Sequence, residues 1–129
     1  MKIFYTNNLN LHAMNALRNK VQLIGNLGVQ PELKTLESGK TVVNFSMATN
    51  EKFRNQEGVL ITDTQWHSIV AWGKTAEIIA QYVNKGQEIA IEGKLTHRTY
   101  TSPEGETKYK SEVLCTEVLL LQNKGVQID

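Results

Sequence analysis

The sequence predicts an all-β fold: a five-stranded Greek-key barrel with one α-helix between the third and fourth strands. Three observations lead to this prediction. Short stretches of alternating apolar and polar residues recur along the 129 residues, and glycine, proline and asparagine turns separate them. Only residues 75–86 show the period of an amphipathic helix. That helix follows the third strand and precedes the fourth, which is the element order of this barrel.

The first strand covers residues 20–27. Its apolar residues alternate at the start, and Gly25 and Gly28 indicate a bend or a bulge near its end. A short extended piece, residues 32–36, follows Pro31.

The second strand covers residues 41–49, after a turn at residues 37–40. Val43, Phe45 and Met47 fall on one face, which favours a buried face for this strand. Residues 51–63 are predicted to be a polar loop or the tip of a hairpin, with a turn at residues 55–58.

The third strand contains two tryptophans. Trp66 and Trp72 are six residues apart, so alternation places both on one face. Ile69 and Ala71 fall on the other face and can supply the core. The tryptophan face is therefore free for flat ligands that stack on rings, although core packing remains an alternative for each ring.

The helix and the last two strands complete the barrel. Thr75 is predicted to cap the helix, Glu77 to lie in its first turn and Gly86 to end it. Ala76, Ile79, Ala80 and Val83 form its apolar stripe. The fourth strand covers residues 88–97, where Gly93 indicates close backbone approach. A turn at residues 102–105 precedes the last strand, residues 108–122, which is predicted to break near Thr116.

This order of elements is that of the OB-fold, whose usual binding region is the face of strands two and three with two neighbouring loops.

The composition fits a binding protein of one domain. The formal charge is +1, which argues against a uniformly basic protein but leaves room for a local positive groove. The single cysteine, Cys115, excludes an internal disulfide and multi-cysteine zinc sites. His12, His67 and His97 lack metal-ligand spacing, so no metal and no cofactor is expected. No apolar run is long enough for a membrane span.

Short motifs run in order from residue 19 to residue 95. They are Asn19-Lys20-Val21, Ile24-Gly25-Asn26-Leu27-Gly28, Pro31-Glu32, Thr64-Gln65-Trp66-His67, Trp72-Gly73-Lys74-Thr75-Ala76-Glu77, Tyr82-Val83-Asn84-Lys85-Gly86 and Ile91-Glu92-Gly93-Lys94-Leu95. In this order and spacing the chain resembles the bacterial single-stranded DNA-binding protein family.

The resemblance implies sequence-independent binding and protection of single-stranded DNA in replication, recombination and repair, without enzymatic activity. It implies base-stacking roles for Phe53, Trp66, Trp72 and Tyr100. Basic residues interleave with these rings and are candidates for phosphate contacts: Lys20, Arg54, Lys74, Lys94, Arg98, Lys108 and Lys110. Many relatives carry a basic residue where this chain has Ser68, which puts one phosphate contact in doubt.

The resemblance also implies a homotetramer, with His67 at the subunit interface, and a cytoplasmic, nucleoid-associated location. We expect residues 1–16 to be a flexible extension, residues 17–124 the DNA-binding domain and residues 125–129 a short remnant. The family's acidic C-terminal tail does not appear in this sequence, so recruitment of replication and repair proteins is not expected.

Two other functions compete with this one. An RNA-binding barrel would use the same stacking rings, because every base has a flat face. A small hydrolase would use His67 with Asp63 or Glu92, but a nucleophile elbow and a metal cluster are both missing from the sequence.

Overall fold

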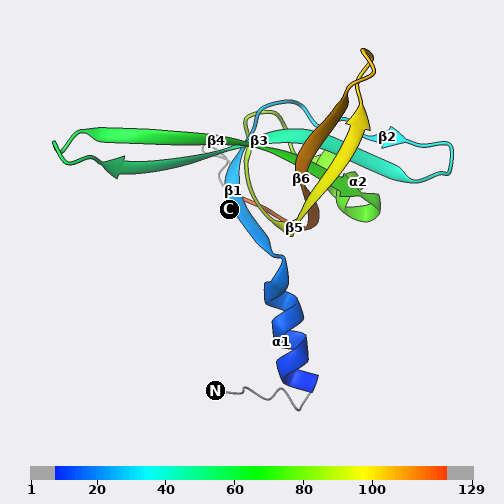
Figure 1. Ribbon diagram of the computed structural model, residues 1–129, viewed down its shortest axis with the longest axis horizontal. Helices are drawn as coiled ribbons and strands as arrows, with labels where there is room; N and C mark the ends of the chain where they lie inside the picture. The colour runs from blue at the N-terminus through cyan, green and yellow to red at the C-terminus, as the bar shows by residue number, and fades with distance from the viewer. Residues whose placement is uncertain (1–7, 122–129) are drawn as a thin grey trace, which may run out of the picture.

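A computed structural model describes the backbone of residues 8–121 and the side chains of residues 13–121. Six strands and two helices make up this part of the chain (Figure 1). In order they are α1 (Asn8–Arg18), β1 (Val21–Leu27), β2 (Lys34–Thr35), β3 (Thr41–Arg54), β4 (Leu60–Trp72), α2 (Gly73–Tyr82), β5 (Glu88–Thr101) and β6 (Thr107–Leu120). Neither helix is long and apolar enough to cross a membrane.

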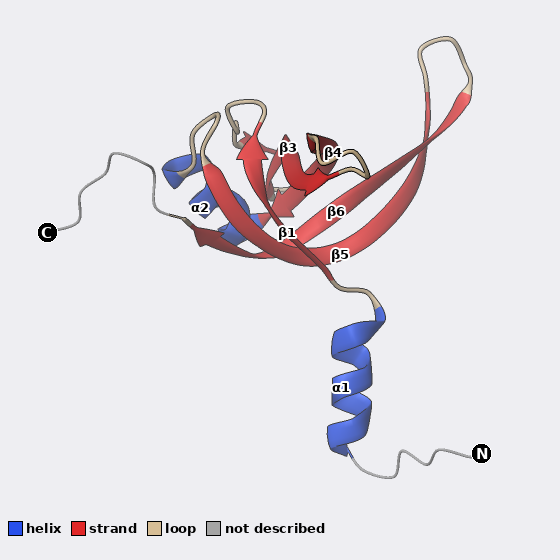
Figure 2. Ribbon diagram, turned by 90° about the vertical axis from the view of Figure 1, so that its left-hand side faces the viewer, coloured by secondary structure: helices blue, strands red, loops and turns tan. Residues whose placement is uncertain are grey.

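The five long strands close into a barrel (Figure 2). The short strand β2 pairs with the edge of β3. The strand order is β1-β5-β6-β4-β3-β2, and β1 also pairs with β3 at Asn26 and Leu27. A short parallel pairing joins β4 to β6 at Ile69↔Val113 and Val70↔Leu114. The other pairings are antiparallel. The predicted barrel with a helix between its third and fourth long strands is therefore confirmed.

The core lies inside the barrel, under α2. Val43, Phe45 and Met47 of β3 are all buried, as the alternation predicted. The predicted core face of β4 is buried as well, since Ile69 is 1% and Ala71 0% exposed. Ala76, Ile79 and Val83 of the helix pack on the same cluster, and Ala80 is partly buried beside them.

The start of α2 differs from the prediction. The helix begins at Gly73, its N-cap is Trp72, and no side chain makes a capping hydrogen bond. Gly73 has a φ of +59°, a conformation that glycine adopts readily. The chain therefore turns from β4 directly into the helix, so Thr75 lies inside the first turn instead of capping it. Glu77 falls beyond that turn, which contains no acidic residue.

The end of α2 also differs. The helix ends at Tyr82, and the N–H of Val83 donates to the carbonyl of Ile79. Gly86 was predicted to end the helix, but it lies in the connection to β5 with a φ of +85°. Its N–H donates to the carbonyl of Leu27 at 2.8 Å, so this glycine ties the connection to β1.

Two long hairpins project from the barrel. β3 and β4 remain paired out to Arg54↔Leu60, so the stretch predicted as a loop or hairpin tip is a hairpin. Its turn is where the sequence placed it, with Gly58 at a φ of +79°. β5 and β6 pair out to Thr101↔Thr107, around the predicted turn at residues 102–105. Figure 1 shows both hairpins extending beyond the barrel wall.

The predicted break in the last strand is a β-bulge. Glu92 pairs with Glu117 and Gly93 with Cys115, so Thr116 is left without a partner in the ladder. A Cβ on Gly93 would lie 2.1 Å from the carbonyl oxygen of Leu114. The close backbone approach predicted for Gly93 is therefore confirmed.

Helix α1 was not predicted from the sequence, which favoured a flexible extension to residue 16. Its sequence, NLNLHAMNALR, holds three asparagines, which are weak helix formers. The helix extends away from the barrel (Figure 2). Residues 1–7 of the predicted extension and the whole predicted C-terminal remnant lie outside the described residues, and the proposed domain boundaries stay predictions.

Candidate nucleic-acid interface

The two tryptophans of β4 lie on the outer surface of the barrel. Trp66 is 62% exposed and Trp72 is 43% exposed, while Ile69 and Ala71 between them point into the core. The alternation therefore acts as predicted: one face of β4 supplies the core, and the other presents two large rings to solvent.

The ring of Trp66 rests on β3 and on the chain that follows β1. An ideal Cβ at Gly28 would lie 2.6 Å from Cζ3 of Trp66 and 2.7 Å from Oγ of Ser46. The absence of a side chain at Gly28 therefore makes room for the indole. The N–H of Gly28 donates to the carbonyl of Ser46 at 2.9 Å, which fixes this backbone beneath the ring. One edge of the indole is held by the barrel, and most of the side chain stays open to a ligand.

A groove with a volume of about 520 Å³ begins at Trp72 and crosses four strands. Its lining residues are Val42 and Asn44 of β3, Val70 and Trp72 of β4, Thr96, His97 and Arg98 of β5, and Glu112 and Leu114 of β6. The parallel pairing of Val70 with Leu114 joins the two halves of this surface. The groove is therefore built by the closure of the barrel, not by one segment of sequence.

Tyr100 lies beyond the groove on the β5–β6 hairpin. It is 42% exposed, and the guanidinium carbon of Arg98 is 5.8 Å from the centre of its ring. Arg98 and Tyr100 are two residues apart on one strand, so they share a face. The structure thus brings Trp72, Arg98 and Tyr100 together along one surface.

Phe53 lies apart from the other three rings. It is 49% exposed and pairs with Ile61 in the β3–β4 hairpin. Trp66 pairs with Ala48, which is an odd number of positions from Phe53 on β3. Alternation therefore places Phe53 on the opposite face of the hairpin ribbon from Trp66. A ligand that contacted both rings would have to pass around the hairpin. The spacing of the two residues in the sequence does not reveal this geometry.

Five of the seven candidate phosphate contacts, Lys108 among them, already have partners at the ends of their side chains. Lys20 is 3.4 Å from Glu92, and Arg54 donates to the carbonyl of Gly58 at 2.9 Å. Arg98 donates from Nε to Glu112 at 2.6 Å, and Nζ of Lys110 is 3.9 Å from the same carboxylate.

The remaining candidates are Lys108, Lys94 and Lys74. Lys108 is cross-strand from Tyr100 and 3.9 Å from the exposed Glu106. Lys94 is exposed on β5, and Lys74 is exposed in the first turn of α2, just after Trp72. Ser68 is partly buried opposite Ser46, so no charge lies between the two tryptophans on β4.

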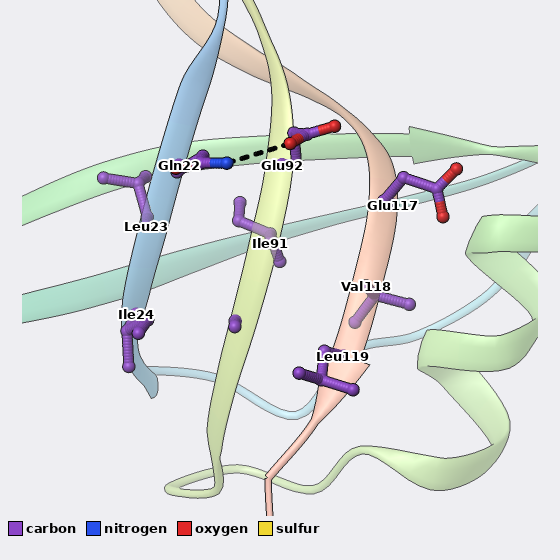
Figure 3. Close-up of a pocket in the computed structure, with 9 residues that line it drawn as sticks. Gln22, Leu23, Ile24, Ile91, Glu92, Glu117, Val118 and Leu119 are labelled. Carbon is purple, nitrogen blue, oxygen red and sulfur yellow. Dashed lines mark hydrogen bonds between the residues drawn. The ribbon is translucent and has the colours of Figure 1, made fainter.

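A second hollow, of about 760 Å³, lies over β1, β5 and β6 (Figure 3). Ile24 and Leu119 at this hollow are 61% and 63% exposed. Gln22 donates to Glu92 at 3.0 Å beside them. This hydrogen bond, together with Lys20, lowers the pKa of Glu92. This apolar surface was not predicted from the sequence, because Ile24 could be placed on the outer face only once the register of β1 was known.

His67 is not hydrogen-bonded to Asp63 or Glu92, the two carboxylates that the hydrolase hypothesis pairs with it. Its Nε2 is 2.9 Å from Oγ1 of Thr49, and the ring is partly buried. Glu92 is hydrogen-bonded to Gln22, and Asp63 accepts from Gln65 at 3.3 Å. The dyad required by the hydrolase hypothesis is therefore not formed. Among residues 8–121 there is also no cluster of His, Cys, Asp and Glu side chains that could hold a metal ion.

Several known proteins are similar to this chain over most of its length. The model of the Single-strand binding protein family matches residues 18–121. A curated relative, Single-stranded DNA-binding protein 1 of Chlorobaculum tepidum, is 47% identical over 107 residues, covering 82% of this chain and 66% of its own. The Single-stranded DNA-binding protein of Xanthomonas campestris is 36% identical over 107 residues, covering 83% of this chain and 62% of its own. This chain thus spans slightly less than two thirds of the length of these relatives.

Two solved structures have a fold similar to that of this chain. The Plasmodium falciparum SSB complex with ssDNA superposes with a TM-score of 0.72 at 30% identity, covering 81% of this chain and 95% of that one. A deletion mutant of the single-stranded DNA-binding protein from Thermus aquaticus also has a TM-score of 0.72, at 27% identity, covering 83% of this chain and 52% of that one.

Proposed function

Since the chain belongs to the single-strand binding protein family, we propose that it binds single-stranded DNA without reading its sequence and protects it during replication, recombination and repair. One observation carries this proposal. Trp66 and Trp72 are exposed on one face of β4, although hydrophobic residues of their size are usually buried. The adjoining groove lies between Trp72 and the Arg98–Tyr100 pair, so bases can stack along it.

The physical basis of such binding is stacking combined with charge. Every base has a flat face, so each stacked base adds about 1–3 kcal/mol whatever its identity. Lysine and arginine side chains beside the rings attract the phosphates, and each phosphate neutralised adds about 0.7 to the log–log salt slope. No cofactor is needed for this activity. The proposed contacts are the four aromatic and seven basic residues named from the sequence, with Phe53 reached only around the hairpin.

DNA is a better-supported ligand than RNA. The solved Plasmodium falciparum protein is a complex with ssDNA, and both curated relatives are named for single-stranded DNA. The surface itself offers no basis for a preference for RNA, because stacking rings accept the bases of both nucleic acids.

The proposal is tested by titrating the protein with oligo-dT while intrinsic tryptophan fluorescence is measured. Stacked bases are expected to quench the emission. Trp66→Ala and Trp72→Ala should each weaken binding while the protein stays folded, as monitored by circular dichroism. Tyr82→Ala is a matched control, because Tyr82 is 55% exposed on α2, outside the groove. Tighter binding to oligo-U than to oligo-dT at equal salt would contradict the choice of DNA.

We also propose that the protein assembles as a homotetramer through the apolar surface at Ile24 and Leu119. Two large aliphatic side chains, each more than 60% exposed and both next to one hollow, are typical of a surface that another subunit covers. His67 is proposed to support the assembly from its hydrogen bond with Thr49. A cytoplasmic, nucleoid-associated location is part of the same proposal.

A further inference from the structure

One acidic residue, Glu112, lies among the residues that line the groove beside Trp72. It is 6% exposed. An acidic residue is unexpected in a groove that binds nucleic acid, because a carboxylate repels phosphates. One carboxylate oxygen accepts from Nε of Arg98 at 2.6 Å, and the other is 3.9 Å from Nζ of Lys110. The buried carboxylate thus bridges two of the cations that were predicted to bind phosphate.

The register explains this arrangement. Arg98 is directly opposite Lys110, and Glu112 is opposite Thr96, so all four side chains lie on one face of the β5–β6 hairpin. Directly opposed like charges destabilise a strand pair, and the diagonal carboxylate offsets their repulsion. The hydroxyl of Thr96 donates to the backbone carbonyl of Glu112 at 3.2 Å, which fixes the residue that carries the carboxylate.

The bridge also sets the orientation of Arg98. With Nε held by Glu112, the guanidinium carbon lies 5.8 Å from the centre of the Tyr100 ring. The Arg98 side chain remains 54% exposed, so part of the guanidinium plane can meet a ligand. A planar guanidinium can stack on a base as an aromatic ring does, which an ammonium group cannot do.

We propose that Glu112 is a positioning residue for nucleic-acid binding. By holding Arg98 beside Tyr100, it makes Arg98 a stacking surface for a base and removes it from the set of free phosphate contacts. This inference rests on the proposed function and assigns a specific role within it. The three charged side chains together then contribute one net positive charge instead of two.

The test is a set of variants titrated with oligo-dT at several salt concentrations. Arg98→Lys keeps the charge and removes the plane. We expect it to weaken binding by about two- to fivefold, the size of an exposed cation–π contact, and to leave the salt slope unchanged. Glu112→Gln should release Arg98 and steepen the slope by about 0.7, since one more cation becomes free for phosphate. In the Glu112→Gln background, Arg98→Lys should then cost little.

Each alternative gives a different result. If Arg98 is an ordinary phosphate contact, Arg98→Lys binds like the wild type and the inference is wrong. If Glu112 only stabilises the hairpin, Glu112→Gln lowers the melting temperature but leaves affinity and slope unchanged, which also overturns it. Glu88→Gln is the matched control, because it removes an exposed charge at the start of β5, outside the groove. A protein that does not bind oligo-dT under any of these conditions would refute the proposed function itself.

Discussion

Gly28 leaves room for the indole of Trp66, and Gly28→Ala tests whether this room positions the ring. The φ of Gly28 is not positive, so alanine is compatible with the backbone there. The added Cβ would, however, lie 2.6 Å from Cζ3 of Trp66, where ordinary contact begins at 3.4 Å. The ring must therefore move outward by about 0.8 Å or rotate, and Oγ of Ser46, which would lie 2.7 Å from the same Cβ, must shift as well.

The expected loss follows from this displacement. Overpacking of this kind costs about 1–3 kcal/mol of stability, and the lower backbone entropy of alanine returns about 0.4–1 kcal/mol. If the Trp66 platform is lost entirely, affinity falls by the value of one stacked base, about 1–3 kcal/mol or roughly 5- to 150-fold. Affinity for oligo-dT and quenching of tryptophan emission are the two measurements.

A double-mutant cycle decides whether the effect acts through the ring. Gly28→Ala should have little further effect on affinity when Trp66 is already alanine, because only the close contact with Oγ of Ser46 then remains. An equal loss in both backgrounds would show that Gly28 contributes in some other way. Unchanged binding and quenching in the single variant would refute the reasoning that Gly28 positions the indole.

Two further predictions concern assembly and pH. Ile24→Glu should lower the mass found by light scattering, because a charge would be buried at the proposed subunit interface, while Val59→Glu, at a residue 54% exposed on the β3–β4 hairpin, should not. Burial raises the pKa of the Cys115 thiol from 9.0 to about 11. Below pH 9 the thiol is neutral in both the folded and the unfolded protein. Above pH 9 it ionises first in the unfolded protein, so the free energy of unfolding falls as pH rises from 9 to 11. Denaturant titrations should show that wild type loses more stability over this range than Cys115→Ala.

Local patterns were enough to predict most of the barrel. Alternation located the buried face of β3 and the exposed tryptophans of β4, because a strand side chain can face only inward or outward. Glycine and proline positions located the turns for a similar reason, since few backbone conformations are available there. The cap of α2 was predicted wrongly at Thr75, because Gly73 allows a direct turn that sequence propensity does not anticipate.

The sequence by itself determined the fold class, the family and the side chains available for stacking and charge. Only the tertiary structure decided which of them act together. It placed Phe53 on the opposite face of the hairpin from Trp66, joined Arg98 to Glu112, and exposed Ile24 on an outer wall of the barrel. The physical reason is that these relations depend on register and barrel closure, which bring residues from distant strands into contact. Periodicity within one strand contains no information about its neighbour.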